Sequence, residues 1–155
     1  DNILDYVESV DKRIPKEPMV GVSRIEHIDD EFLITKYAPG ETYGDLTDVR
    51  FDSLKHLAWT LGRLNGSGIF MADFHDDNFV IDANKAYIID QGALAVVKGM
   101  QLGDSDTTNM RDLYKVISNE DTNLSNLGVE HTIYEIGRCF KSGFNGKPYS
   151  EDFEL

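Results

Sequence analysis

Cysteine, positive charge and long apolar runs are all scarce in this sequence of 155 residues. Cys139 is the only cysteine, which excludes an internal disulfide and allows a reducing or disulfide-indifferent compartment. No apolar run approaches the ~20 residues that a membrane-spanning helix needs. The N-terminus carries no signal-like segment. We therefore expect no membrane span.

Basic residues are also few: 15 Lys and Arg stand against 28 Asp and Glu, giving a formal net charge of −13. This balance argues against nucleic acid or an anionic membrane surface as the main partner. A cationic substrate or a basic protein patch fits better, although acidity that serves only solubility is the favoured explanation. With 41% hydrophobic residues, the chain can bury a core and is expected to form one compact unit.

The most informative stretch covers residues 71–92. It contains two short β-prone apolar runs, residues 79–81 and 86–89, which are joined by the turn-rich residues 82–85. This pattern predicts a tight β-hairpin. Polar side chains lie just before its first strand and just after its second strand.

Asp73 and Asn78 precede the first predicted strand, and Asp90 follows the second. Because antiparallel pairing brings the start of one strand beside the end of the next, these three residues are expected to converge. Asn78 and Asp90 offer hard oxygen ligands for Mg²⁺, and Asp73 is left to accept a proton from a hydroxyl. The set suits phosphoryl transfer, whereas the plainer alternative is an Asp-rich surface turn.

These residues resemble the catalytic loop and metal-binding turn of the protein-kinase-like superfamily. Asp73 and Asn78 keep the family spacing of Asp, four intervening residues and Asn, and the sequence from Asp90 to Gly92 stands in for Asp-Phe-Gly. The resemblance implies that the γ-phosphoryl group of ATP is transferred to a hydroxyl. Asp73 would orient and deprotonate the acceptor, while Asn78 and Asp90 would hold Mg²⁺.

Three positions depart from the usual protein-kinase pattern. Met71 stands where His is common, Gln91 replaces Phe, and His75 replaces Lys. His75 looks more like aminoglycoside, choline and lipopolysaccharide-core kinases, although a bracing role in the loop explains it equally well. The short segment after Gly92 looks like compact bacterial kinases, including secreted effectors. The acceptor therefore stays open between a protein Ser or Thr and a cationic small molecule, and the location between the cytoplasm and a host cytoplasm.

The expected fold is α+β and protein-kinase-like. Residues 1–36 would be a remnant of the small lobe, with a helix at 1–13 and strands at 20–28 and 31–37. Residues 37–143 would form the mostly helical catalytic lobe, with helices at 52–66, 109–117 and from Val129 onward, and residues 144–155 a loose acidic tail. Asp52 is expected to cap the first of these large-lobe helices.

The resemblance also implies roles outside the catalytic loop. Glu8 would pair with an ATP-contacting Lys, and the backbone of Lys36, Tyr37 and Ala38 would meet the adenine edge. Asp112 would accept hydrogen bonds from the catalytic-loop backbone. The plain alternatives are exposed helix acids for Glu8 and Asp112, and a strand followed by a turn for the hinge-like residues.

The sequence lacks Gly-x-Gly-x-x-Gly and lacks a Lys in a β-run before the first helix. We therefore expect the N-terminal strands of the small lobe to be missing, and nucleotide binding by these residues alone to be weak. A pseudokinase-like binding module without turnover is the alternative from another class. A third alternative, an acidic domain without a site, predicts no convergence of Asp73, Asn78 and Asp90.

Overall fold

The computed structural model describes residues 2–29, 32–35, 38, 41–42, 50–74, 76–82, 84–97, 108–118 and 128–150. Its helices are α1 (Asn2–Arg13), α2 (Phe51–Gly66), α3 (Met110–Ile117) and α4 (Val129–Phe144). Its strands are short: β1 (Ile25–Ile28), β2 (Leu33–Thr35), β3 (Glu41–Thr42), β4 (Ile69–Met71), β5 (Phe79–Asp82), β6 (Lys85–Ile88) and β7 (Leu94–Val96). The expected α+β class is confirmed. No helix among the described residues is long and apolar enough to cross a membrane.

Three small antiparallel sheets are described: β1 with β2, β4 with β7, and β3, β5 and β6 in that order. The predicted hairpin is β5–β6, whose pairing runs from Phe79 opposite Ile88 to Asp82 opposite Lys85. Asp82 and Lys85 were expected in the turn but form the last pair of the ladder. The β4–β7 pair was not expected, and Met71, placed in a loop by the sequence, is the last residue of β4.

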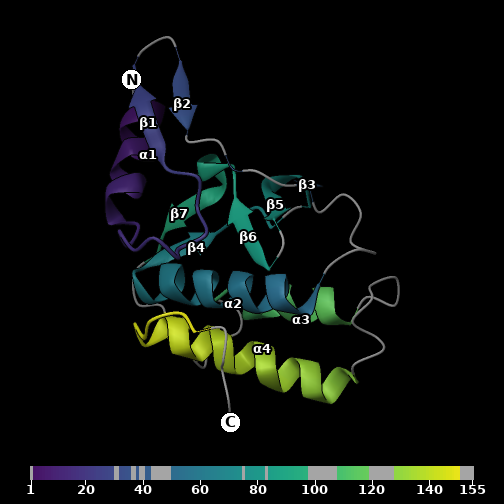
Figure 1. Cartoon of the computed structure of the whole chain (residues 1–155). Helices are drawn as coiled ribbons and strands as arrows, with labels where there is room; N and C mark the ends of the chain where they lie inside the picture. The colour runs from purple at the N-terminus through teal and green to yellow at the C-terminus, as the bar shows by residue number, and fades with distance from the viewer. Residues whose placement is uncertain are drawn as a thin grey trace.

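Helix α2 lies between α4 and the strands in Figure 1. Its predicted apolar stripe is buried, since Leu54, Leu57, Leu61 and Leu64 are at most 1% exposed. Trp59, which lies off that stripe, is also fully buried. The helix is therefore buried on more than one face, because α4 packs along it as well.

Glycines allow α2 and α4 to approach each other closely. A Cβ atom at Gly62 would overlap the carbonyl oxygen of Phe140, and one at Gly143 would overlap that of Trp59. Since these neighbours are backbone atoms of a packed helix, they cannot move aside cheaply. The backbones of the two helices thus meet directly where both glycines lie.

The start of α2 differs from the expectation. Arg50 occupies the N-cap position without a side-chain hydrogen bond to the helix, and Asp52 is the second helical residue. Asp52 instead lies 3.4 Å from Lys55, and its charge in the first turn still complements the helix dipole.

His56 joins α2 to two other segments. Its Nε2 atom lies 2.7 Å from the carbonyl oxygen of Met19, and the backbone N–H of Ala86 donates to its Nδ1 atom at 3.0 Å. Since a carbonyl can only accept and an amide N–H only donates, the ring is neutral with its proton on Nε2. Burial, together with the nearby charge of Lys85, lowers the pKa of His56 more than the backbone contacts to Met19 and Ala86 raise it.

The chain after α4 begins with residues that pack on α2, where the sequence suggested a loose tail. The indole N–H of Trp59 donates to the carbonyl oxygen of Lys147 at 2.9 Å. The ring of Tyr149 lies 5.1 Å from that of His56 and 5.3 Å from that of Trp59. Residues 145–150 therefore belong to the packed structure, and residues 151–155 lie outside the described part.

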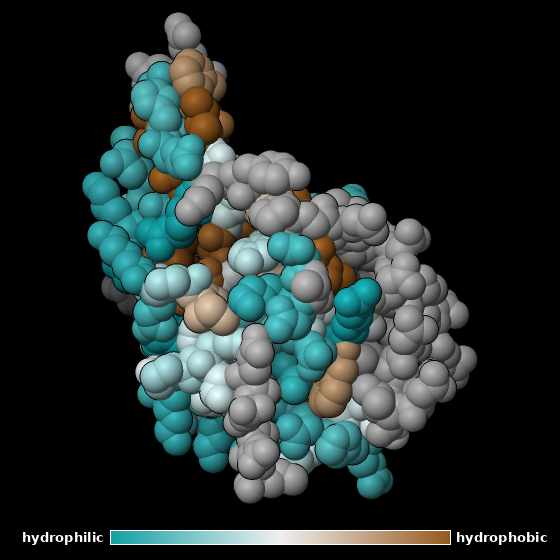
Figure 2. All heavy atoms as spheres, viewed as in Figure 1, coloured by the Kyte–Doolittle hydropathy of each residue, from teal (hydrophilic) through white to brown (hydrophobic). Residues whose placement is uncertain are grey.

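At the other end of the chain, α1, β1 and β2 project from the helical body (Figure 1). Val10 and Ile14 anchor this part by burying at least 99% of their surface. Of the strand expected at residues 20–28, only Ile25–Ile28 is formed, while Val22 makes a single parallel bridge to Ile88. Figure 2 shows hydrophobic surface over this projection, where Phe32, Leu33 and Ile34 are 40–48% exposed.

Candidate active site

The loop between β4 and β5 carries the first two candidate residues. The side-chain amide of Asn78 donates to the carbonyl oxygen of Asp73 at 3.0 Å, which closes the loop on itself. Asn78 ends a short 3₁₀ turn (Asp76–Asn78) and is only 8% exposed, whereas Asp73 is exposed. The loop thus fixes the amide and leaves the Asp73 carboxylate open to solvent.

Asp90 lies directly after β6, in a second tight turn. Its Oδ1 atom accepts from the backbone N–H of Gly92 at 2.9 Å, and Asp90 caps the 3₁₀ turn Gln91–Ala93. The preceding residue, Ile89, donates its N–H to the carbonyl oxygen of Asn78 at 3.0 Å. Asn78 and Asp90 are therefore held as near neighbours by the open end of the hairpin.

A further backbone contact joins both turns. The N–H of Ala72, next to Asp73, donates to the carbonyl oxygen of Ala93 at 2.7 Å. Together with the bonds from Asn78 and Ile89, this contact holds the backbones of Asp73, Asn78 and Asp90 near one another. This proximity of the backbones is what antiparallel pairing predicts.

The donor set fits a hard divalent cation that is held mainly by a phosphate ligand. The Asn78 amide is oriented through its nitrogen, so its oxygen faces away from the Asp73 carbonyl, and Asp90 uses only Oδ1 within its turn. Mg²⁺ in such sites takes one or two protein oxygens and fills the rest of its shell with water and phosphate. In the described residues no group of three or more His, Cys, Asp or Glu is placed to cage a metal alone.

A buried pair of asparagines holds the start of the loop. Asn109, fully buried, accepts from the N–H of Met71 at 3.0 Å and donates to the Met71 carbonyl oxygen at 2.9 Å. Asn65 donates to the Asn109 side-chain oxygen and accepts from its backbone N–H, at 2.9 and 2.8 Å. Position 71 is thereby fixed two residues before Asp73.

The bracing role expected for Asp112 is thus performed, at Met71, by Asn109. Asp112 accepts from the Nδ2 atom of Asn109 at 3.0 Å, so its described link to the loop passes through that amide. Asp112 lies in the first turn of α3, three residues after the N-cap residue Asn109.

Helix α1 presents two acids to different partners. Glu8, expected to pair with an ATP-contacting Lys, has its Oε1 atom 3.3 Å from the Nζ atom of Lys12, and the Lys12 and Glu8 side chains are 72% and 46% exposed. Exposed pairs of this kind stabilise by about 0.3–0.5 kcal/mol. Asp11, which sequence reasoning passed over, contacts both Arg24 and Gln91.

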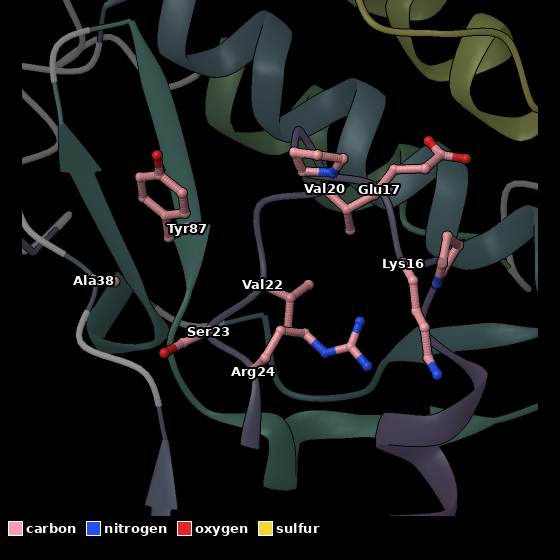
Figure 3. Close-up of a pocket in the computed structure, with 10 residues that line it drawn as sticks. Lys16, Glu17, Val20, Val22, Ser23, Arg24, Ala38 and Tyr87 are labelled. Carbon is pink, nitrogen blue, oxygen red and sulfur yellow. The ribbon is translucent and has the colours of Figure 1, made fainter. Parts of the chain in front are cut away.

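Of the residues expected to meet adenine, Lys36 and Tyr37 lie outside the described residues, as does His75. Ala38 is described and lines a cavity of about 510 Å³, together with Tyr87 and residues between Pro15 and Arg24. Figure 3 shows Lys16 and Arg24 on one side of this space and Tyr87 on the other. Asp73, Asn78 and Asp90 do not line it.

Two further residues of the site were missed in the sequence. Asn109 was expected only as the start of a helix, and Gln91 only as a departure from the Phe of the family turn. A local signal existed in each case, because an amide next to apolar helix or strand residues must find partners when it is buried. The local sequence does not show which partners the buried amide binds.

Neither a comparison with protein-family models nor one with curated proteins found a match for this chain.

Proposed function

We propose that this chain is the catalytic part of a kinase-like phosphotransferase, which uses ATP and Mg²⁺ to phosphorylate a hydroxyl. The observation that carries the proposal is the set of three backbone and amide contacts that gathers Asp73, Asn78 and Asp90. A carboxylate open to solvent beside an amide and a second carboxylate is the minimal set that positions an acceptor and a metal-bound phosphate.

In this proposal each residue has a distinct task. Asp73 orients the acceptor hydroxyl and takes its proton, which requires an accessible carboxylate. Asn78 and Asp90 offer the oxygens that would hold Mg²⁺, which when bound would neutralise phosphate charge. Asn109 fixes the start of the loop through the backbone of Met71.

The proposed fold is protein-kinase-like, which the β5–β6 hairpin after the loop, the pairing of β4 with β7 and the buried α2 before the loop support. The backbone of residues 36–38 is proposed to meet adenine and Glu8 to pair with an ATP-contacting Lys. The acceptor is a protein Ser or Thr or a cationic small molecule, and a compact bacterial enzyme, cytoplasmic or secreted into a host, is the proposed setting.

A pseudokinase-like binding module is the second candidate. Gln91 favours it, because a buried amide occupies the place of the apolar residue that the resemblance implies. The domain without a site is disfavoured, since that alternative predicts no convergence of the three residues.

Nucleotide binding by the full natural chain tests the proposal. We expect calorimetric titration with ATP to show binding that depends on Mg²⁺, and Asp90→Asn to weaken the Mg²⁺-dependent part by about tenfold or more. Asp82→Asn is the matched control, because it removes the same charge from the exposed far end of the same hairpin. Binding that ignores Mg²⁺, or equal losses in both variants, would count against the proposed metal site.

A further inference from the structure

Gln91, the residue after Asp90, connects the candidate metal-binding turn to α1. Its side chain is 2% exposed, and its Nε2 atom donates to Asp11 Oδ1 at 2.8 Å and to the Ser23 carbonyl oxygen at 2.7 Å. Its Oε1 atom is buried without a partner among the described residues. The polar stabilisation of this side chain therefore comes through Nε2.

Asp11 is a firmly held acceptor. Arg24 donates from Nε to Oδ1 at 3.2 Å and from Nη2 to Oδ2 at 3.3 Å, and the N–H of Ile25 donates to Oδ1 at 3.3 Å. Burial by itself would raise the pKa of Asp11, but the hydrogen bonds from Arg24, Gln91 and Ile25 outweigh it and leave the pKa below its usual value. The carboxylate is thus charged at neutral pH and fixed from several sides.

The turn that carries Asp90 is short, and between the backbone contacts of Ile89 and Ala93 the side chain of Gln91 is a buried polar anchor. Asp90 caps a 3₁₀ turn of three residues, of which Gln91 and Ala93 are buried and Gly92 is exposed. A side chain anchored at position 91 therefore restricts the backbone rotation that aims the neighbouring carboxylate. If an apolar residue of similar size stood at position 91, Asp11 and the Ser23 carbonyl would each lose a donor.

We propose that Gln91 is a positioning residue for Asp90, which acts through its hydrogen bond to Asp11, so that the placement of α1 sets the affinity of the site for Mg²⁺. This inference rests on the proposed function. It makes α1 part of the metal site without any contact between α1 and the metal. In this proposal Asp11, as well as Glu8, links α1 to the catalytic site.

The test is a titration of Mg²⁺ into the full natural chain with a fluorescent ATP analogue, which reports binding without turnover. Gln91→Met keeps the length of the side chain and removes the donor. We expect the Mg²⁺ concentration at half-maximal binding to rise about tenfold, as for the loss of other groups that orient metal ligands. Gln91→Asn, whose amide is too short to reach Asp11, should show the same shift and serves if the first variant folds poorly.

A double-mutant cycle with Asp11→Ala separates positioning from simple destabilisation, because an Asn at position 11 would keep an oxygen that accepts from Gln91. We expect the double variant to shift the Mg²⁺ dependence no further than Gln91→Met alone, because both changes break one link. Ile136→Val is the control: it trims a fully buried residue of α4, costs about 1 kcal/mol of stability and should leave the Mg²⁺ dependence unchanged.

The outcomes are distinguishable. If wild type shows no Mg²⁺-dependent nucleotide binding, the proposed function fails and this inference falls with it. If wild type shows it but the Gln91 variants match wild type, or the shifts with Asp11→Ala are additive, the positioning role is wrong and the proposed function stands.

Discussion

The bracing of the loop between β4 and β5 by Asn109 gives a sharp prediction through the substitution Asn109→Asp. The change keeps the shape of the side chain and the acceptor for the Met71 N–H, but replaces the Nδ2 donor with a carboxylate oxygen. The Met71 carbonyl would then lose its hydrogen bond at a fully buried position, which costs about 1–3 kcal/mol.

Asp112 adds a second penalty. Its Oδ2 atom lies 3.0 Å from the Asn109 nitrogen, so the variant places two carboxylates against each other. At that separation their repulsion is about 5 kcal/mol for an effective dielectric constant of about 20, less whatever movement of the Asp112 side chain or protonation relieves. We expect a net loss of about 4 kcal/mol in the free energy of unfolding at pH 7.

Urea unfolding, followed by circular dichroism, measures this loss. With a slope of about 2 kcal/mol per molar urea, the midpoint should fall by about 2 M. Ser150→Asp is the control, because it adds the same charge at an exposed position and should shift stability by less than about 0.5 kcal/mol. Equal midpoints for the two variants would refute the bracing role of Asn109.

Three other predictions concern the core. Gly143→Ala should destabilise the protein by about 3 kcal/mol, because the added Cβ meets the backbone of α2. Gly137→Ala, whose Cβ would make only an ordinary contact at 3.8 Å, should be neutral or stabilising by up to ~1 kcal/mol. Equal urea midpoints for the two variants would contradict this. Burial lowers the pKa of His56 below that of the unfolded chain, so the stability that neutral His56 contributes should be fully present above about pH 6.5 and fall as the pH drops through the folded pKa. In His56→Gln, the urea midpoint should therefore decline less between pH 7 and 5 than it does in wild type. Burial raises the pKa of Cys139 to about 12, so a thiol reagent should modify the native protein only as fast as it unfolds, and rapid native labelling would contradict this burial.

The local parts of this structure were predictable from the sequence. The β5–β6 hairpin follows from two short apolar runs around a turn-rich link, and the stripe of leucines predicts α2. The meeting of Asn78 and Asp90 follows from the hairpin alone, because antiparallel pairing leaves its two open ends adjacent.

What the sequence did not show are contacts between distant segments. The burial of Trp59 depends on α4 and on Lys147, which follows it by 88 positions. Gln91 meets Asp11 across 80 positions, and Asn109 meets Asn65 across 44. These contacts depend on how whole helices and strands pack together, and neither hydrophobic periodicity nor motif spacing in the local sequence predicts them.

The proposed function rests most directly on phosphoryl transfer by the full natural chain. The measurement is release or transfer of the γ-phosphoryl group of labelled ATP with Mg²⁺, comparing wild type with Asp73→Ala and Asp90→Ala and with Asp82→Ala as the control of equal charge change. We expect turnover in wild type and the control, and none in the two site variants. Binding of Mg²⁺ and ATP without turnover toward any acceptor would support the binding module instead, and an absence of nucleotide binding would contradict both kinase-like readings of the site.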